Sequence, residues 1–206
     1  KNNSTVANIS FSNKEDYGTE SFSRSVAMSD IDGDGKIDIA VASQTLISVF
    51  RNISSSDQIS FTAKKDFTAG FNSIDVCIGD IDADGKRDLV IASLGDTNIS
   101  VYRNTSITGN ISFAAKTDYT SGARPMGVAL GDLDGDGKLD VAIANETDNT
   151  LSVLMNTSTN GNLSFTSKVD FSVGSDPRSI VIGDIDGDVK PDLTSVNWSD
   201  NTVSVL

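Results

Sequence analysis

The chain has 206 residues, of which 37% are hydrophobic, and its formal net charge is −13. This length and apolar content suffice for one sizeable core, whereas the acidic balance excludes a nucleic-acid partner, whose phosphates need a basic face. No run of 18 apolar residues is present, so we expect no insertion into a membrane.

An acidic segment recurs four times along the chain. The first copy, DIDGDGKID, spans residues 30–38, and the later copies span 80–88, 132–140 and 184–192. Each copy places Asp at positions 1, 3, 5 and 9, and the starts are separated by 50, 52 and 52 residues. Like charges this close repel one another, so each cluster requires a counter-charge.

The surroundings of the acidic segment repeat in the same phase. A phenylalanine stands 19 residues before each first Asp, and a second aromatic residue stands 13 residues before it. SVFRN, SVYRN and SVLMN follow the first three copies, and the fourth copy is followed by SVL. We therefore divide a single domain, residues 1–206, into repeats 1–50, 51–102, 103–154 and 155–206.

Each repeat reads as four short strands. In the third, apolar runs at 126–132 and 139–145 flank the acidic loop, and alternating runs follow at 149–156 and 162–171. Turn residues separate these runs, and no helical pattern is present. Four strands in about fifty residues are typical of a propeller blade. The sequence predicts an all-β fold, a β-propeller of four-stranded antiparallel blades with four blades in this chain.

Two interpretations of the ring remain open. In a closed four-blade ring, residues 8–17 would complete the sheet formed by residues 179–206 and so remove an open edge. Alternatively, the four blades belong to a larger propeller or a longer repeat array. The number of repeats favours neither.

The acidic loops have the composition of a calcium cage. A tight loop turns the four carboxylates toward one point, the carbonyl of position 7 adds an oxygen, and calcium takes six to eight oxygen ligands. Zinc prefers nitrogen or sulfur. The predicted ligands are Asp30, Asp32, Asp34, Lys36 (carbonyl) and Asp38; Asp80, Asp82, Asp84, Lys86 (carbonyl) and Asp88; Asp132, Asp134, Asp136, Lys138 (carbonyl) and Asp140; Asp184, Asp186, Asp188, Lys190 (carbonyl) and Asp192.

The fourth loop departs from the pattern at position 6, where Val189 replaces glycine. A β-branched residue is poorly suited to a left-handed backbone angle, so we expect this site to be the weakest or to have altered geometry. An EF-hand is excluded, because it needs Glu at position 12 and a following helix. Position 12 here holds Val41, Ile91, Ile143 or Ser195, and a strand pattern follows.

GDLDGDGKLDVAIAN and its copies resemble FG-GAP or VCBS repeats, the calcium-loop blades of integrin-alpha-type β-propellers. The resemblance extends over essentially the whole chain, although only four blades are present where the familiar ring has seven. It implies about four structural calcium ions and an extracellular or cell-surface location. It also implies adhesive proteins, or domains attached to secreted enzymes.

Three classes of function follow from these expectations. The first is a non-enzymatic binding or adhesion module for a protein or glycan. The second is a structural subunit of a surface layer, filament or long repeat protein, with copies of itself as partners. An enzyme is disfavoured, because the chain lacks histidine and its most prominent carboxylates lie in regular repeated loops. The single cysteine, Cys77, is expected in a buried strand.

A partner surface is expected on the face opposite the acidic loops, where the remaining loops gather. Trp198 there either stacks on a sugar or covers a neighbouring blade. The candidate partner-binding residues are Trp198, Asp200, Asn201, Glu146, Asp148 and Arg124. The chain also carries many N-x-S/T sequences, which predict glycosylation or reflect polar turn chemistry.

Overall fold

The computed structural model describes residues 1–206 and contains strands and turns but no helix. It accordingly has no helix long and apolar enough to cross a membrane. The prediction of an all-β chain is confirmed, and the strands are short, as expected for runs of β-branched and other apolar residues bounded by Gly, Asn and Asp.

Fifteen strands form four antiparallel sheets, each made from consecutive strands. The first sheet contains β1 (Ser25–Ser29), β2 (Asp38–Ala42), β3 (Leu46–Phe50) and β4 (Lys65–Thr68). The second contains β5 (Ser73–Gly79), β6 (Asp88–Ser93), β7 (Asn98–Tyr102) and β8 (Thr117–Thr120). The third contains β9 (Pro125–Gly131), β10 (Asp140–Asn145), β11 (Thr150–Leu154) and β12 (Val169–Ser172). The fourth contains only β13 (Pro177–Gly183), β14 (Asp192–Asn197) and β15 (Thr202–Val205).

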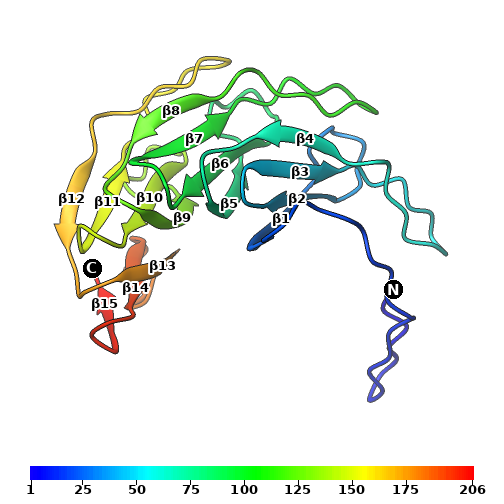
Figure 1. Cartoon of the computed structure of the whole chain (residues 1–206), viewed down its shortest axis with the longest axis horizontal. Helices are drawn as coiled ribbons and strands as arrows, with labels where there is room; N and C mark the ends of the chain where they lie inside the picture. The colour runs from blue at the N-terminus through cyan, green and yellow to red at the C-terminus, as the bar shows by residue number, and fades with distance from the viewer.

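The four sheets are arranged in an arc (Figure 1). Their first strands, β1, β5, β9 and β13, lie next to one another in sequence order. The second strands are the most deeply placed, and every residue of β6 and β10 is buried. Because these strands are covered on both faces, their sequences are nearly continuous apolar runs rather than alternating ones.

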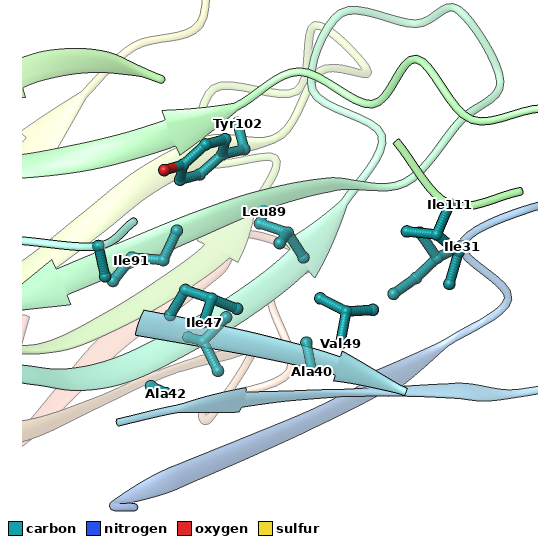
Figure 2. Packing of buried hydrophobic residues seen from close by; sticks show 11 residues of the cluster. Ile31, Ala40, Ala42, Ile47, Val49, Leu89, Ile91, Tyr102 and Ile111 are labelled. Atoms are coloured by element: carbon teal, nitrogen blue, oxygen red, sulfur yellow. The ribbon is translucent and has the colours of Figure 1, made fainter. Parts of the chain in front are cut away.

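Hydrophobic side chains fill the space between successive sheets. The core between the first and second sheets includes Ile47 and Val49 from one side and Leu89, Ile91 and Tyr102 from the other (Figure 2). Two further cores lie between the second and third sheets and between the third and fourth. The sheets therefore stabilise one another, and none is a self-contained unit.

An arm extends from the third strand of each of the first three sheets. Its two chain segments meet at an isolated bridge, which pairs Asn52 with Phe61, Asn104 with Phe113, and Asn156 with Phe165; residues Asn2 and Phe11 form the same arrangement at the start of the chain. The single strand predicted over 162–171 was therefore too long. Phe165 belongs to the arm, and the fourth strand is only Val169–Ser172.

Of the two interpretations left open for the ring, the closed four-blade ring is not found in the structure. Residues 8–17 do not pair with the last sheet, which has three strands, and the two ends of the chain lie far apart in Figure 1. Tyr17 instead packs edge-to-face on Phe61, with ring centroids 5.2 Å apart, and also contacts Phe50. These contacts hold the segment beside the first sheet, at the opposite end of the arc from β15.

Candidate metal centre

Each acidic loop is folded by hydrogen bonds to its own first carboxylate. In the first loop, Asp30 accepts hydrogen bonds from the backbone N–H groups of Gly33 (2.9 Å), Asp34 (3.1 Å) and Gly35 (2.8 Å). The third and fourth loops repeat all three contacts. The loop is thus pre-formed by backbone donors, and the strands on either side fix its ends.

The left-handed turn at position 6 is present in all four loops. Gly35, Gly85 and Gly137 have φ of 85°, 85° and 87°, and Val189 has φ of 71°. The fourth loop therefore has the same backbone turn at position 6 as the other three, and the expected change of geometry there is not seen. Its departure from the pattern places a β-branched residue in a conformation that such residues rarely adopt.

The carboxylate at position 9 anchors the loop to the sheet. Asp38 accepts a hydrogen bond from the backbone N–H of Ile31 (2.9 Å) and another from that of Asn52 (2.8 Å). Burial raises the pKa of Asp38, and it raises the pKa of its counterpart Asp88 to about 6. Burial also raises the pKa of Asp140. A nearby cation would offset this desolvation.

Every loop brings together three carboxylates whose oxygens lie within 4.8 Å of one another. These groups are Asp30, Asp32 and Asp38; Asp80, Asp82 and Asp88; Asp132, Asp134 and Asp136; Asp184, Asp186 and Asp192. The predicted ligands Asp34, Asp84, Asp140 and Asp188 lie in the same loops but outside these triplets. A ligand role for the carbonyls of Lys36, Lys86, Lys138 and Lys190 stays a prediction.

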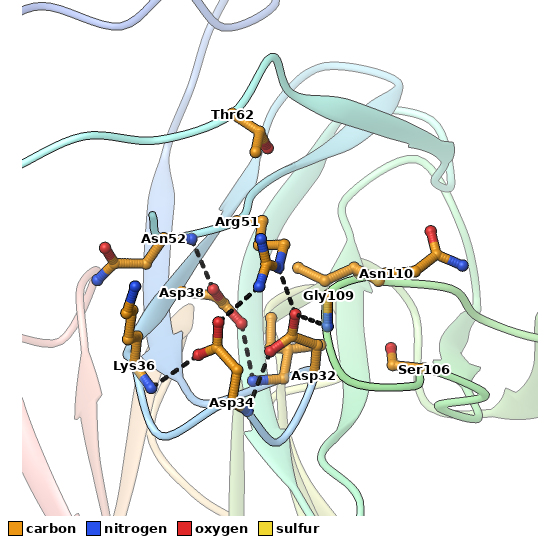
Figure 3. A network of polar contacts seen from close by, with 12 residues as sticks. Asp32, Asp34, Lys36, Asp38, Arg51, Asn52, Thr62, Ser106, Gly109 and Asn110 are labelled. Atoms are coloured by element: carbon orange, nitrogen blue, oxygen red, sulfur yellow. Dashed lines mark hydrogen bonds and ion pairs between the residues drawn. The ribbon is translucent and has the colours of Figure 1, made fainter. Parts of the chain in front are cut away.

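Arginine side chains supply part of the counter-charge in the first two loops. Arg51 donates to Asp32 and, at 2.6 Å, to Asp34 (Figure 3). Arg103 bonds Asp82 at 2.7 Å and Asp84 at 3.2 Å. This role was not predicted from the sequence, although the arginine that SVFRN and SVYRN share was a usable signal. The third repeat has Met155 at this position.

The arm of each following sheet covers the loop of the sheet before it. The backbone N–H of Gly109 bonds Asp32 at 2.9 Å, and the side chain of Asn104 bonds the carbonyl of Ile31 at 2.8 Å. Asn156 makes the same contact with the carbonyl of Ile81 (2.8 Å). Asp32 and Asp82, at position 3 of the first two loops, are consequently buried, whereas Asp134 and Asp186 at the same position are exposed.

The donor chemistry of the loops fits a hard cation. All candidate side-chain ligands are carboxylate oxygens, which calcium prefers. In the second loop, Ala83 lies where the other loops have glycine, and its N–H makes no bond to Asp80. The Oδ1 atom of Asp80 is buried without any hydrogen-bond partner. An unpartnered buried carboxylate oxygen is costly, and a bound cation would satisfy it.

A second polar cluster lies on the face opposite the acidic loops. Glu146 pairs with Arg124 and also approaches Arg178 at 3.6 Å. Arg178 bonds Asp176 at 2.9 Å, and its guanidinium lies 4.7 Å from the centroid of the Trp198 ring. Trp198 belongs to the last sheet and is 65% exposed, so both interpretations of its role stay predictions. Arg178, which was not among the predicted partner-binding residues, contacts both Glu146 and Trp198 and so joins the two halves of this cluster.

The other predicted partner-binding residues shape the turns beside this cluster. Asp148 accepts the backbone N–H of Ala123 at 2.7 Å, and Asp200 accepts that of Ser175 at 2.6 Å. Asn201 occupies a left-handed position with φ of 54°. These contacts make Asp148 and Asp200 scaffolding residues of the loop face.

Burial limits which sequons are accessible. Asn104, Asn145, Asn156 and Asn197 are at most 4% exposed, so these side chains cannot carry a glycan in the folded chain. All four side-chain amides also donate two hydrogen bonds. Their Asn-x-Ser/Thr pattern therefore reflects turn chemistry. Glycosylation of the exposed sequons stays a prediction.

Comparison with known proteins shows the family. The model of the FG-GAP-like repeat matches residues 30–91, 80–143 and 132–195, and the chain belongs to this family. No curated protein sequence gives a significant match. Among solved structures, the chain resembles a functionally unknown protein from Desulfotomaculum acetoxidans DSM 771, with 16% identity and a TM-score of 0.57. The match covers 92% of this chain and 56% of that protein, so the chain spans little more than half of its length.

Proposed function

We propose that the chain is a calcium-stabilised, β-propeller-type module that acts outside the cell as a non-catalytic binding or adhesion unit. The observation that carries this proposal is the fourfold recurrence of one pre-formed loop with at least three convergent carboxylates. The membership in the FG-GAP-like repeat family supports it. A single acidic turn would be weaker evidence, because exposed acidic turns are common without a metal.

The propeller assignment rests on how the sheets meet. The first strands lie side by side around the inside of the arc, and the sheets pack face to face around them. This arrangement supports an interpretation of the sheets as successive blades. Since the two ends of the arc do not meet, we assign the chain as a sector of a larger ring rather than as a closed four-blade ring.

The role assigned to calcium is structural. The ion supplies positive charge that relieves repulsion among the loop carboxylates, and binding to the native state stabilises it by mass action. The +8 of four calcium ions would bring the formal charge of −13 to −5. The chain's own residues set the cage: the backbone donors orient the first carboxylate, and the arms cover part of each of the first two loops.

The partner site is assigned to the cluster of Arg124, Glu146, Arg178 and Trp198. An exposed tryptophan beside an arginine offers an apolar ring face together with hydrogen-bond donors, a combination suited to a sugar or a polar protein surface. Trp198→Ala would remove the ring, and Phe71→Ala on the loop face of another repeat is the matched control. Loss of binding on a glycan array or to a protein ligand in the first variant alone supports the assignment.

The calcium proposal is tested by thermal unfolding in millimolar calcium and in excess chelator, with native mass spectrometry on the same samples. We expect a large fall in Tm on chelation and about four bound ions per chain. The variant Asp132→Asn/Asp134→Asn should lose one ion, whereas Asp148→Asn, an acidic residue outside the loops, should keep all of them. An unchanged Tm together with no bound ions would overturn the metal assignment.

A further inference from the structure

A buried asparagine connects the first acidic loop to the second. Asn104, which follows β7, donates its backbone N–H to Asp88 of the second loop at 2.7 Å. Its side-chain amide donates to the carbonyl of Ile31 in the first loop at 2.8 Å, and Ile31 donates its own N–H to Asp38 at 2.9 Å. Asn104 therefore contacts both loops directly, and through Ile31 it is connected to the position-9 carboxylate of the first.

Asn156 makes the same contacts one repeat later. Its backbone N–H donates to Asp140 of the third loop at 2.7 Å, and its amide donates to the carbonyl of Ile81 in the second loop at 2.8 Å. The N–H of Ile81 donates to Asp88 at 2.9 Å. Since Asp88 also accepts the N–H of Asn104, one hydrogen-bond network extends without interruption from the third loop to the first.

This network is shielded from water. Its members are all at most 4% exposed: Ile31, Asp38, Ile81, Asp88, Asn104, Asp140 and Asn156. Hydrogen bonds are stronger in such surroundings, and a broken one leaves a buried polar group without a partner. A displacement of one loop therefore costs free energy unless the neighbouring loop moves with it.

The contacts of the network lie on or beside predicted metal ligands. Asp38 and Asp88 each belong to a triplet of carboxylates whose oxygens converge within 4.8 Å. Ile31 lies between Asp30 and Asp32, the other two members of the first triplet. The groups that place the ligands of one loop are thus bonded to a ligand of the next loop.

The connection between the first and second loops has two additional contacts. Arg103 pairs with two carboxylates of the second loop, and the backbone N–H of Gly109 bonds Asp32 of the first loop at 2.9 Å. Met155 and Gly161 lie at these two positions in the next repeat, where the asparagine alone connects the loops. The first pair of loops is therefore more tightly connected than the second pair.

We propose that neighbouring loops bind calcium cooperatively, with Asn104 and Asn156 as the positioning residues that couple them. The proposal rests on the calcium assignment above and adds regulation of each site by its neighbour. Asp88, once fixed by an ion, holds Asn104 in place, and Asn104 holds Ile31 between the ligands of the first loop. Such coupling is reciprocal, so occupancy of the first loop favours the second by the same factor.

Calcium titration resolved by loop tests the coupling. The residue at position 6 donates its backbone N–H to the first carboxylate of its own loop, so its amide NMR signal reports on that loop. The four reporters are Gly35, Gly85, Gly137 and Val189. Chelator buffers set the calcium concentration, at about 0.15 M salt to screen direct repulsion between bound ions.

Asp80→Asn disables the second loop, and Asp184→Asn is the matched control at the same position of the fourth loop, which is not adjacent to the first. We expect Asp80→Asn to raise the calcium concentration that half-fills the first loop by at least about fivefold, and the control to change it by less than about twofold. Asp30→Asn should raise the midpoint of the second loop by a similar factor. Asp132→Asn should raise that midpoint by a smaller factor.

Asparagine variants test which residues carry the coupling. Asn156→Ala should abolish the effect of Asp132→Asn on the second loop, and Asn104→Ala should weaken the effect of Asp80→Asn on the first. Asn52→Ala, which leaves both connections intact, should change neither effect. Coupling that persists in full in Asn156→Ala would overturn the role of the asparagine.

The midpoint of the first loop decides the proposal even where an asparagine variant does not fold. A midpoint that stays the same or falls in Asp80→Asn would overturn the coupling. If every loop still responds to calcium, the loops then fill independently and the metal assignment stands. If no reporter signal responds to calcium, the coupling and the metal assignment are both wrong.

Discussion

The side-chain amide of Asn104 bonds the backbone carbonyl of Ile31, a residue 73 positions earlier in the preceding sheet, at 2.8 Å. Its second N–H bonds the carbonyl of Arg87 at 2.8 Å. One buried side chain therefore fastens an acidic loop, its own sheet and the following arm. Buried amides that satisfy two carbonyls at once are costly to remove, because the carbonyls are left without donors.

The first prediction concerns this asparagine. Asn104→Ala should lower the free energy of unfolding by about 3 kcal/mol, since two carbonyls lose their donors. The matched control is Asn52→Ala, which loses one carbonyl contact, that with Ile37, at a half-buried site. Both variants also lose the bond that the asparagine oxygen accepts from the backbone N–H two residues later, of Ser106 or Ser54. We expect about 1 kcal/mol or less for the control. Urea unfolding at low protein concentration measures both, and equal losses would contradict the role of the contact with Ile31.

Val189 is the subject of the second prediction. Its φ of 71° places a β-branched residue in the left-handed region, at a cost on the order of 1–3 kcal/mol. Val189→Gly should relieve this strain, offset in part by the greater flexibility of glycine when unfolded. We expect a net gain of about 1 kcal/mol, seen as a Tm roughly 2–4 °C higher for a chain of this size.

The reverse change is the control for this position. Gly137→Val in the third loop places valine at φ of 87° and should lower the Tm by a similar or larger amount. Calcium titration of both variants shows whether the fourth loop binds more tightly once the strain is removed. A Tm that is unchanged or lowered in Val189→Gly would show that the fourth loop tolerates valine without strain.

The repeat in the sequence was sufficient to predict the strands, the loops and their phase. Period-2 alternation and the spacing of turn residues are local properties, so the strand order within a sheet follows from them. The length of the outer strands could not be predicted from local sequence. Phe165 fits the alternating pattern of a strand, yet it pairs with Asn156 in an arm. The conformation of Phe165 depends on the neighbouring second sheet, because the ring of Tyr119 in β8 packs on the Phe165 ring with centroids 4.9 Å apart.

In the candidate metal site, too, the local features were predicted from the sequence and the contacts between strands were not. The spacing of Asp30, Asp32 and Asp38 predicted that their carboxylates converge, because one tight loop carries all three. The ion pairs of Arg51 with the loop carboxylates were not predicted, although Arg51 lies only 13 residues after Asp38. Its guanidinium reaches the loop because β3 runs antiparallel to β2 and ends beside the loop. The position of Arg51 within the sequence repeat does not by itself reveal this contact. The sequence left ring closure open for a related reason, since residues 14–17 have the pattern of an outer strand but the pattern does not say which sheet that strand would join.

The third prediction follows from the difference between Arg51 and Met155. The third repeat lacks the arginine that neutralises the first two loops, so its carboxylates depend more on an added cation. Met155→Arg should raise the Tm in excess chelator and reduce the fall in Tm that chelation causes. The opposite change, Arg103→Met, should enlarge that fall. Equal chelator sensitivity in the two variants would show that the arginine does not substitute for a cation.

The last prediction concerns the reactivity of Cys77. Burial, with a smaller contribution from the charge of Asp75, raises the pKa of this thiol to about 12. Its Sγ also lies 2.9 Å from the carbonyl oxygen of Val128. Only the thiolate reacts with alkylating agents, so the folded chain at pH 8 should react about a thousandfold more slowly than a free thiol.

The pH dependence separates this cause from simple shielding. Because the folded-state pKa is raised, the thiolate fraction and the labelling rate should keep rising about tenfold per pH unit up to pH 11. An unperturbed cysteine would reach a constant rate just above pH 9. The urea-unfolded chain provides that reference in the same protein. A folded-state rate that levels off near pH 9 would show that the thiol has an ordinary pKa, and a rate that does not depend on pH would show that access rather than ionisation limits the reaction.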